Sequence, residues 1–174
     1  RAIPVRFTEA PTVKTPGKRA SEAERQAYRK AKRDHNLSGQ TLPLIRNVRC
    51  ALDLRGGLHR KMLCSLDGSF CNRTIFRAHM ERTELLARCR KDARLCFPAE
   101  PGQRRKYRKE TFTHEQIRQD SKLAWCQATI WFGGTWRSIR YKEVKDVLWR
   151  RGAGTRRLRL IVLAPQPYKL SLHS

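Results

Sequence analysis

The sequence is short of acidic residues and lacks the motifs of several common enzyme classes. It holds 15 Asp and Glu residues against 39 Lys and Arg residues, and it contains neither a glycine-rich phosphate loop nor a Gly-x-Ser-x-Gly motif. No apolar run approaches the roughly 20 residues that are needed to cross a bilayer. These absences argue against P-loop nucleotidases, α/β-hydrolases and membrane-spanning proteins, and we expect no membrane partner.

Metal-ligand spacing is also absent. The six cysteines form no Cys-x-x-Cys pair, and the five histidines are scattered along the chain. Cys64 and Cys89 fall in apolar, strand-like runs, where a reduced cysteine packs as a small hydrophobic side chain. Structural thiols are therefore favoured over a zinc site, and free thiols are typical of a cytoplasmic protein.

The charge that is present is strongly positive. The formal net charge is +24, and the basic residues run from Arg1 to Lys169 instead of lying on one amphipathic helix. A domain with this charge repels itself unless a polyanion neutralises it, and the phosphate backbone of nucleic acid is the usual polyanion. Charge alone does not distinguish an enzyme from a ribosomal type of binding protein.

The first part of the chain predicts a connecting segment and two helices. Residues 1–20 contain several prolines and no periodic pattern, so we expect an extended segment there. Ser21 begins a basic helix that ends near His35, for which a solvated face is favoured over a DNA-reading one. Thr41 begins a second helix that ends at Gly56, with core-facing residues at helical spacing: Leu44, Ile45, Val48, Ala51 and Leu52.

An aspartate follows the first expected strand. Residues 61–66 form a short apolar run, and Gly68 breaks it directly after Asp67. A short helix over 72–80 and a strand over 84–90 come next, an order that fits an α/β layer with parallel strands. Asp67 at the carboxyl end of a strand suits a metal ligand for phosphoryl transfer, and the alternative is that it caps the following helix.

No convincing second ligand accompanies this aspartate. Phosphoryl transfer with two metal ions needs several carboxylates, and the other aspartates lie on predicted helices, loops or hairpin strands, with Asp92 nearest to a suitable position. Glu143 and Asp146 are expected to pair with the neighbouring Lys142 and Lys145. From the residues alone, the site is incomplete.

The second half of the chain predicts an antiparallel sheet. A helical patch over 113–120 precedes two strands over 125–132 and 136–142, which flank a Gly-Gly hairpin turn. Further strands are expected over 144–150 and 158–163. All four tryptophans lie in this half, and we expect them to fill the core of the sheet, with stacking of one or two of them on bases as the alternative.

Two basic runs on predicted loops supply the candidate DNA-binding residues. For each single residue, a merely solvated charge is the alternative, because phosphate contacts are shared among many side chains. The candidates are Arg104, Arg105, Lys106, Arg108, Lys109, Arg150, Arg151, Arg156 and Arg157.

Several segments together resemble the bacterial insertion-sequence transposases of the DDE superfamily of endonucleases. The most specific block is Leu-Asp-Gly-Ser-Phe-Cys-Asn-Arg-Thr over residues 66–74. Similarity extends over residues 88–96, 140–144 and 160–165 and includes the opening Ala-Ile-Pro-Val-Arg-Phe, so that it covers essentially the whole chain.

The resemblance implies an α/β fold in which residues 21–97 form part of a ribonuclease H-like core and residues 98–174 form a basic, β-rich insertion. It implies an acidic triad of two Asp and one Glu that binds Mg²⁺ for DNA cleavage and strand transfer, with Asp67 as the second Asp and a metal ligand. The first Asp and the Glu are expected upstream of Arg1 and downstream of Ser174. We therefore expect an internal piece of a transposase that is inactive alone.

The partner implied by the resemblance is DNA, both as transposon ends and as target, and a homodimer of the intact enzyme is compatible with it. The implied location is the bacterial cytoplasm, in association with the nucleoid. The alternative hypothesis comes from a different class: a non-enzymatic, basic nucleic-acid-binding protein.

Overall fold

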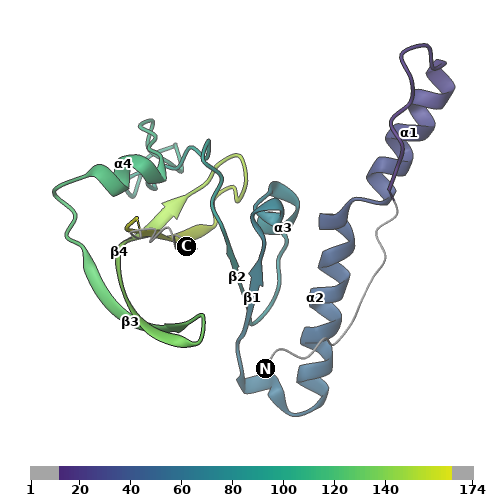
Figure 1. Ribbon diagram of the computed structural model, residues 1–174. Helices are drawn as coiled ribbons and strands as arrows, with labels where there is room; N and C mark the ends of the chain where they lie inside the picture. The colour runs from purple at the N-terminus through teal and green to yellow at the C-terminus, as the bar shows by residue number, and fades with distance from the viewer. Residues whose placement is uncertain (1–11, 166–174) are drawn as a thin grey trace, which may run out of the picture. The chain divides into compact units, whose positions relative to one another are not determined.

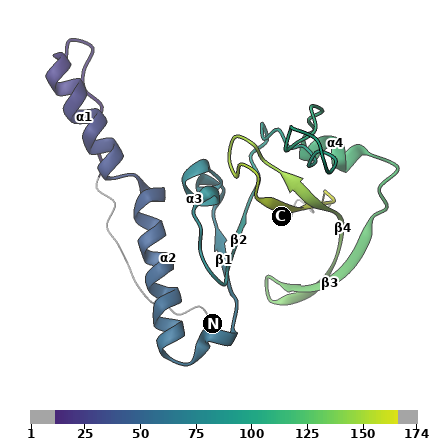
Figure 2. The same cartoon turned by 180° about the vertical axis from the view of Figure 1, so that it is seen from behind.

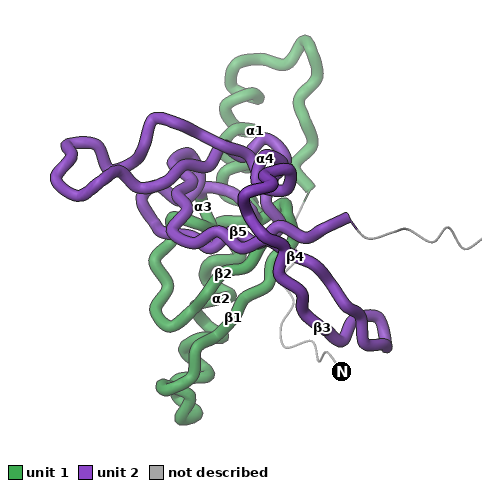
Figure 3. Tube along the Cα trace, turned by 90° about the vertical axis from the view of Figure 1, so that its left-hand side faces the viewer, with its two compact units in different colours: residues 1–70, 74–87 green, residues 71–73, 88–174 purple. Residues whose placement is uncertain are grey.

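The computed structural model describes residues 12–165, and these residues divide into two compact units (Figure 3). Unit 1 comprises residues up to 70 and 74–87, and unit 2 comprises residues 71–73 and 88 onward. Helices and strands are mixed, as the predicted α/β class requires. Residues 88–97, which the sequence grouped with the core, belong to the β-rich unit 2. The first part of the expected extended segment, with the opening motif of the resemblance, lies outside the described residues.

Two helices open unit 1. Helix α1 (Glu22–Asp34) begins at Ser21, as the sequence predicted, and Ser21 and Glu24 form a capping box in which each side chain binds the other's backbone N–H. Helix α2 (Leu37–Leu54) begins before the expected Thr41. The reason is Asn36, whose side-chain oxygen accepts from the backbone N–H of Ser38 at 3.0 Å and caps the helix first.

A buried arginine, more than an apolar stripe, ties α2 to its unit. Of the five residues expected to face the core, only Ile45 is fully buried, and Val48 is 40% exposed. Arg49 is 6% exposed and donates to the backbone carbonyls of Arg60 at 2.8 Å and Gly57 at 2.9 Å. It also pairs with Asp53 at 2.5 Å.

The sheet of unit 1 has two parallel strands, β1 (Met62–Leu66) and β2 (Thr83–Ala87), as predicted. The short elements η1 (Gly57–His59), η2 (Gly68–Phe70) and α3 (Arg73–Arg77) precede β1 or lie between the strands (Figure 1). The second strand ends before its expected limit, so Cys89 lies beyond it. Leu63 and Leu86 remain 66% and 50% exposed, so one face of this pair is uncovered.

Unit 2 contains an antiparallel sheet in the order β3 (Cys126–Phe132), β4 (Thr135–Leu148) and β5 (Arg157–Leu163). The predicted hairpin is confirmed, and both glycines of its turn have positive φ, at 63° and 76°. The expected separate strand over 144–150 is wrong, because β4 continues through a bulge between Val144 and Val147. Asp146 in this bulge has φ of 56°, which breaks the alternation of the strand.

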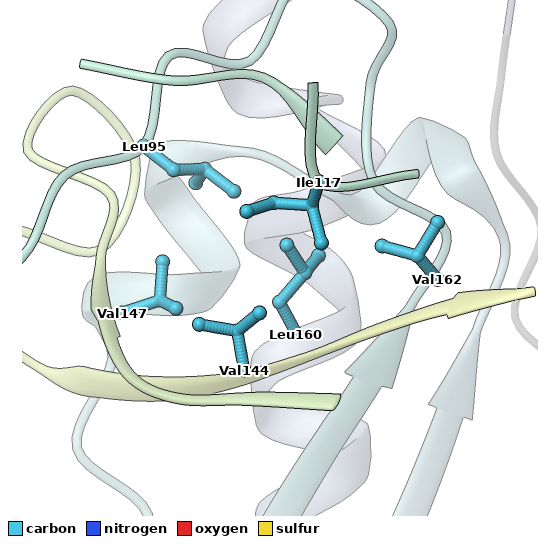
Figure 4. Close-up of a cluster of buried hydrophobic side chains, with 6 residues drawn as sticks. All are labelled: Leu95, Ile117, Val144, Val147, Leu160 and Val162. Atoms are coloured by element: carbon cyan, nitrogen blue, oxygen red, sulfur yellow. The ribbon is translucent and has the colours of Figure 1, made fainter. Parts of the chain in front are cut away.

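The core of unit 2 lies between this sheet and the helix α4 (His114–Gln119) (Figure 4). Aliphatic side chains from β4, β5, α4 and the preceding extended segment meet there: Leu95, Ile117, Val144, Val147, Leu160 and Val162. Thr113 caps α4 through a capping box with Gln116. Part of the sheet therefore packs on one short helix, and the outer half of the β3–β4 hairpin carries no buried residue.

Lys142 of β4 is buried in this unit, at 2% exposure. Its ammonium group donates to the backbone carbonyls of Ile117 at 3.2 Å, Arg118 at 3.0 Å and Asp120 at 2.5 Å. It also lies 4.7 Å from the ring centre of Trp125. These carbonyls end α4, so Lys142 neutralises the negative end of the helix and joins it to the sheet.

The carboxylates near Lys142 form ion pairs that differ in part from those that the sequence predicted. Glu143 contacts Arg159 at 2.8 Å and Lys145 at 3.7 Å, and Asp146 contacts Arg157 at 3.1 Å. The hydrogen bond from Arg159 lowers the pKa of Glu143. The expected pairing with Lys142 is wrong, because that side chain turns into the unit, whereas the pair of Glu143 with Lys145 is present.

The cysteines are free thiols in the structure. Burial raises the pKa of the Cys89 thiol to about 11, with smaller contributions from Cys71 and Asp92. Burial also raises the pKa of the Cys64 thiol. Over residues 12–165, no helix has both the length and the apolar character that crossing a membrane would require.

Replacing Lys142 by methionine tests its role. Lys142→Met keeps the length of the side chain and removes the charge, so three carbonyls at the end of α4 lose a buried donor. We expect the free energy of unfolding to fall by about 2 kcal/mol, measured by urea denaturation. The control Lys145→Met, an exposed lysine of the same strand, should change it by less than about 0.5 kcal/mol. Equal effects would contradict the role assigned to Lys142.

Candidate nucleic-acid interface

Asp67 follows β1 directly and is exposed. Its carboxylate accepts from the hydroxyl of Ser69 at 3.1 Å and from the backbone N–H of Ser69 at 3.4 Å, and its carbonyl accepts from the N–H of Phe70 at 2.9 Å. The side chain therefore stabilises the turn into η2, as the capping alternative predicted. It also stands at the carboxyl end of a parallel strand, where the metal-ligand hypothesis needs it.

A metal site needs more than this one carboxylate. Within residues 12–165, no group of three or more His, Cys, Asp or Glu side chains could hold a metal ion. Asp92, the nearest alternative by sequence, pairs with Arg90 at 3.0 Å, and this hydrogen bond lowers its pKa. The described residues do not by themselves fit Mg²⁺, whose protein ligands are several oxygen atoms in octahedral geometry.

The predicted basic residues all lie in unit 2, on two segments. One is the loop between an isolated bridge at Pro98 and the start of α4, and the other is the turn between β4 and β5. Eight of the nine candidate side chains are exposed, and Arg156 is half-buried. We call these segments the 98–109 loop and the 149–157 turn.

The structure joins the two segments through Tyr107 and Arg150. The Arg150 guanidinium lies 3.7 Å from the centre of the Tyr107 ring, and it donates to the Tyr107 hydroxyl at 3.0 Å. A stacked guanidinium keeps its edge available to a planar anion such as a phosphate. Sequence reasoning missed Tyr107, because it carries no charge and only its contact with Arg150 reveals its importance.

Two further candidates line one open depression of about 440 Å³, whose wall includes Phe97 and Pro98. Arg108 pairs there with Glu100, and Arg157 pairs with Asp146. Both ion pairs are exposed, and exposed pairs contribute little energy. A phosphate group could therefore replace either carboxylate at small cost.

The turn between β4 and β5 is shaped by close packing. The carbonyl of Trp149 accepts from the backbone N–H groups of Gly152 at 3.1 Å, Ala153 at 2.6 Å and Gly154 at 3.0 Å. A Cβ atom at Gly152 would lie 2.1 Å from the Trp149 ring. The turn that presents Arg150 and Arg151 thus requires a glycine beside a tryptophan.

The tip of the β3–β4 hairpin is aromatic and exposed, and the hairpin itself can be followed in Figures 1 and 2. Trp131 and Trp136 are cross-strand partners whose rings meet edge to face, with their centres 5.5 Å apart. They are 60% and 67% exposed. Phe132 is 64% exposed, with Arg137 at 5.8 Å from its ring centre. The expectation that all four tryptophans fill the core is wrong for these two, because they flank a tight turn beyond the reach of the core.

The hairpin tip and the basic segments offer the two kinds of contact that nucleic acid needs. Cations neutralise phosphates, and exposed aromatic rings stack on unpaired bases. Family models, curated proteins and solved structures were each compared with the chain, and none of them matched.

Tyr107 can be tested apart from charge. Tyr107→Leu leaves the net charge unchanged but removes the ring on which Arg150 stacks, so we expect duplex DNA to bind about threefold more weakly in fluorescence anisotropy. Tyr107→Phe keeps the ring and should remain within about twofold of the unmodified protein. An unchanged affinity for Tyr107→Leu would show that the stack does not position Arg150 for binding.

Proposed function

We propose that this chain is part of a DDE-type DNA transposase, in which Asp67 belongs to the catalytic carboxylates and unit 2 binds DNA. The observation that carries the proposal is the exposed Asp67 at the carboxyl end of a parallel strand pair, in a chain that continues into a strongly basic antiparallel unit. This order of elements is the one that the transposase resemblance implies.

The exposure of β1 and β2 supports the proposal independently of charge. Parallel sheets usually bury both faces, yet the face of this pair that carries Leu63 and Leu86 leaves both leucines exposed. Such exposure is expected of two strands that belong to a larger α/β core, as in a ribonuclease H-like fold. Helices packed on the sheet or a neighbouring chain would cover these leucines.

The DNA-binding part of the proposal rests on the excess of positive charge. The chain has 24 more basic than acidic residues, and the 98–109 loop and the 149–157 turn meet at the Tyr107–Arg150 stack. Several cations on one surface bind a polyanion through release of its counterions. Mg²⁺ in the intact enzyme, a homodimer and association with the nucleoid follow from the resemblance alone and belong to the same proposal.

A second candidate is a non-enzymatic, basic nucleic-acid-binding protein. It is favoured by the lack of a three-ligand metal group within residues 12–165. Both candidates predict binding to nucleic acid, but only the first predicts DNA cleavage that needs Asp67.

Asp67→Asn distinguishes the two candidates. In an intact transposase that contains this chain, we expect this variant to lose DNA nicking and to keep DNA binding, because it removes one negative ligand and almost no volume. The control Glu84→Gln removes an exposed carboxylate from the neighbouring strand and should nick normally. Nicking by Asp67→Asn at the normal rate would refute the catalytic assignment of Asp67, whereas no nicking by the unmodified protein would favour the second candidate.

Charge reversal on the two basic segments tests the interface itself. The triple variant Arg104→Glu, Arg105→Glu and Arg151→Glu should bind duplex DNA more weakly. The slope of log K against log salt should fall by about 0.9 for each phosphate that the variant no longer neutralises, as measured by anisotropy titrations at several salt concentrations.

The control for this variant reverses three exposed arginines of unit 1: Arg46, Arg55 and Arg60. It changes the net charge equally, so it should weaken long-range attraction but keep most of the salt slope. If both triple variants behave alike, binding depends on net charge and the assigned interface is wrong.

A further inference from the structure

Helix α1 carries a row of cations that unit 2 does not explain. Arg25, Arg29, Lys32 and Arg33 occupy positions i, i+4, i+7 and i+8, which place them on one face of the helix. All four are exposed. We call this set the basic stripe.

Little of the described protein covers α1. None of its residues is buried, and its described contacts are with the preceding segment: the Tyr28 hydroxyl lies 3.5 Å from that of Thr15, and Arg25 donates to the Lys18 carbonyl at 3.2 Å. Figures 1 and 2 show this segment running beside the helix. The stripe is therefore accessible along the length of α1.

The acidic residues of α1 leave most of the stripe without a strong partner. Glu24 is engaged by Ser21 in the capping box, which lowers the pKa of Glu24. Glu22 pairs with Arg29 at 2.7 Å, but both side chains are about 60% exposed, and such pairs contribute little. Acids gather in the first turn and bases in the last, so the charges separate along the helix.

The opposite face of α1 is poorly suited to a protein partner. It presents Ala23, Ala27 and Ala31, whose small side chains offer little apolar area to a hydrophobic groove. The strong feature of the helix is its charge. A polyanion matches it better than an apolar surface does.

We propose that the basic stripe of α1 binds the phosphate backbone of duplex DNA. This contact would be made in addition to those of the two basic segments of unit 2. This inference rests on the proposed DNA binding by the chain and adds a surface in unit 1. The stripe spans about 12 Å along the helix axis, and that length of duplex carries about seven phosphates. Phosphates are thus dense enough to meet all four cations.

Binding also has a consequence for the helix. Like charges at i and i+4 repel each other, and an isolated helix of this length is marginal in water. Phosphates remove the repulsion, so DNA should stabilise α1. Hydrogen exchange of the backbone amides over 22–34 should therefore slow when duplex DNA is added.

The experiment compares two double variants in the full chain with a duplex oligonucleotide of random sequence. Lys32→Gln with Arg33→Gln removes two cations of the stripe and keeps good helix formers. Arg46→Gln with Arg55→Gln removes two exposed cations elsewhere in unit 1. Circular dichroism checks that both variants keep their helix content.

The stripe variant should lower the salt slope of binding by about two, whereas the control should keep it. Slower exchange over 22–34 on adding DNA should be seen in the unmodified chain and be weaker in the stripe variant. Equal slopes for the two variants, or exchange that DNA leaves unchanged, would overturn the inference. If the unmodified chain fails to bind duplex DNA, the proposed function fails. If the unmodified chain binds and the stripe variant binds with the same salt slope, this inference alone fails.

Discussion

With 39 lysine and arginine residues and 15 acidic ones, the protein has too few carboxylates to neutralise its own cations. Several of the carboxylates that it has lie between elements. In unit 1, Asp53 of α2 contacts both Arg49 and Arg82, and Arg82 directly precedes β2. In unit 2, Glu143 of β4 contacts Arg159 of β5. Ion pairs therefore help to fix the strands, and a large excess of cations stays on the surface for an external polyanion.

Where a cation is buried, backbone carbonyls stabilise it. Among the described residues, Arg49 and Lys142 are the buried cations, and each donates to backbone carbonyls. Lys142 binds carbonyls at the end of α4, which carry the negative end of the helix dipole. Arg49 instead binds the carbonyls of Gly57 and Arg60, which follow the end of α2. Backbone carbonyls thus stabilise both buried cations in a protein that has few acids, and Arg49 also pairs with Asp53.

The regular elements could be predicted from local chemistry, and the errors came from particular residues. The Ser21 cap, the short apolar run of β1 and the Gly-Gly hairpin turn all gave correct elements, because their signals lie within a few residues of one another. The start of α2 was misplaced because Asn36 caps it before Thr41. The split of β4 into two strands was wrong because the strand continues past residue 143 and absorbs its irregularity as a bulge between Val144 and Val147.

The sequence by itself determined the charge, the helix caps, the hairpin and the position of Asp67 after a strand, since each depends on neighbouring residues. Only the tertiary structure decided which distant side chains meet. It buried Lys142 against the end of α4, stacked Arg150 on Tyr107 and left Trp131 and Trp136 exposed at a hairpin tip. These outcomes depend on strand register and on how far a core extends, and no local pattern of charge or hydrophobicity contains that information.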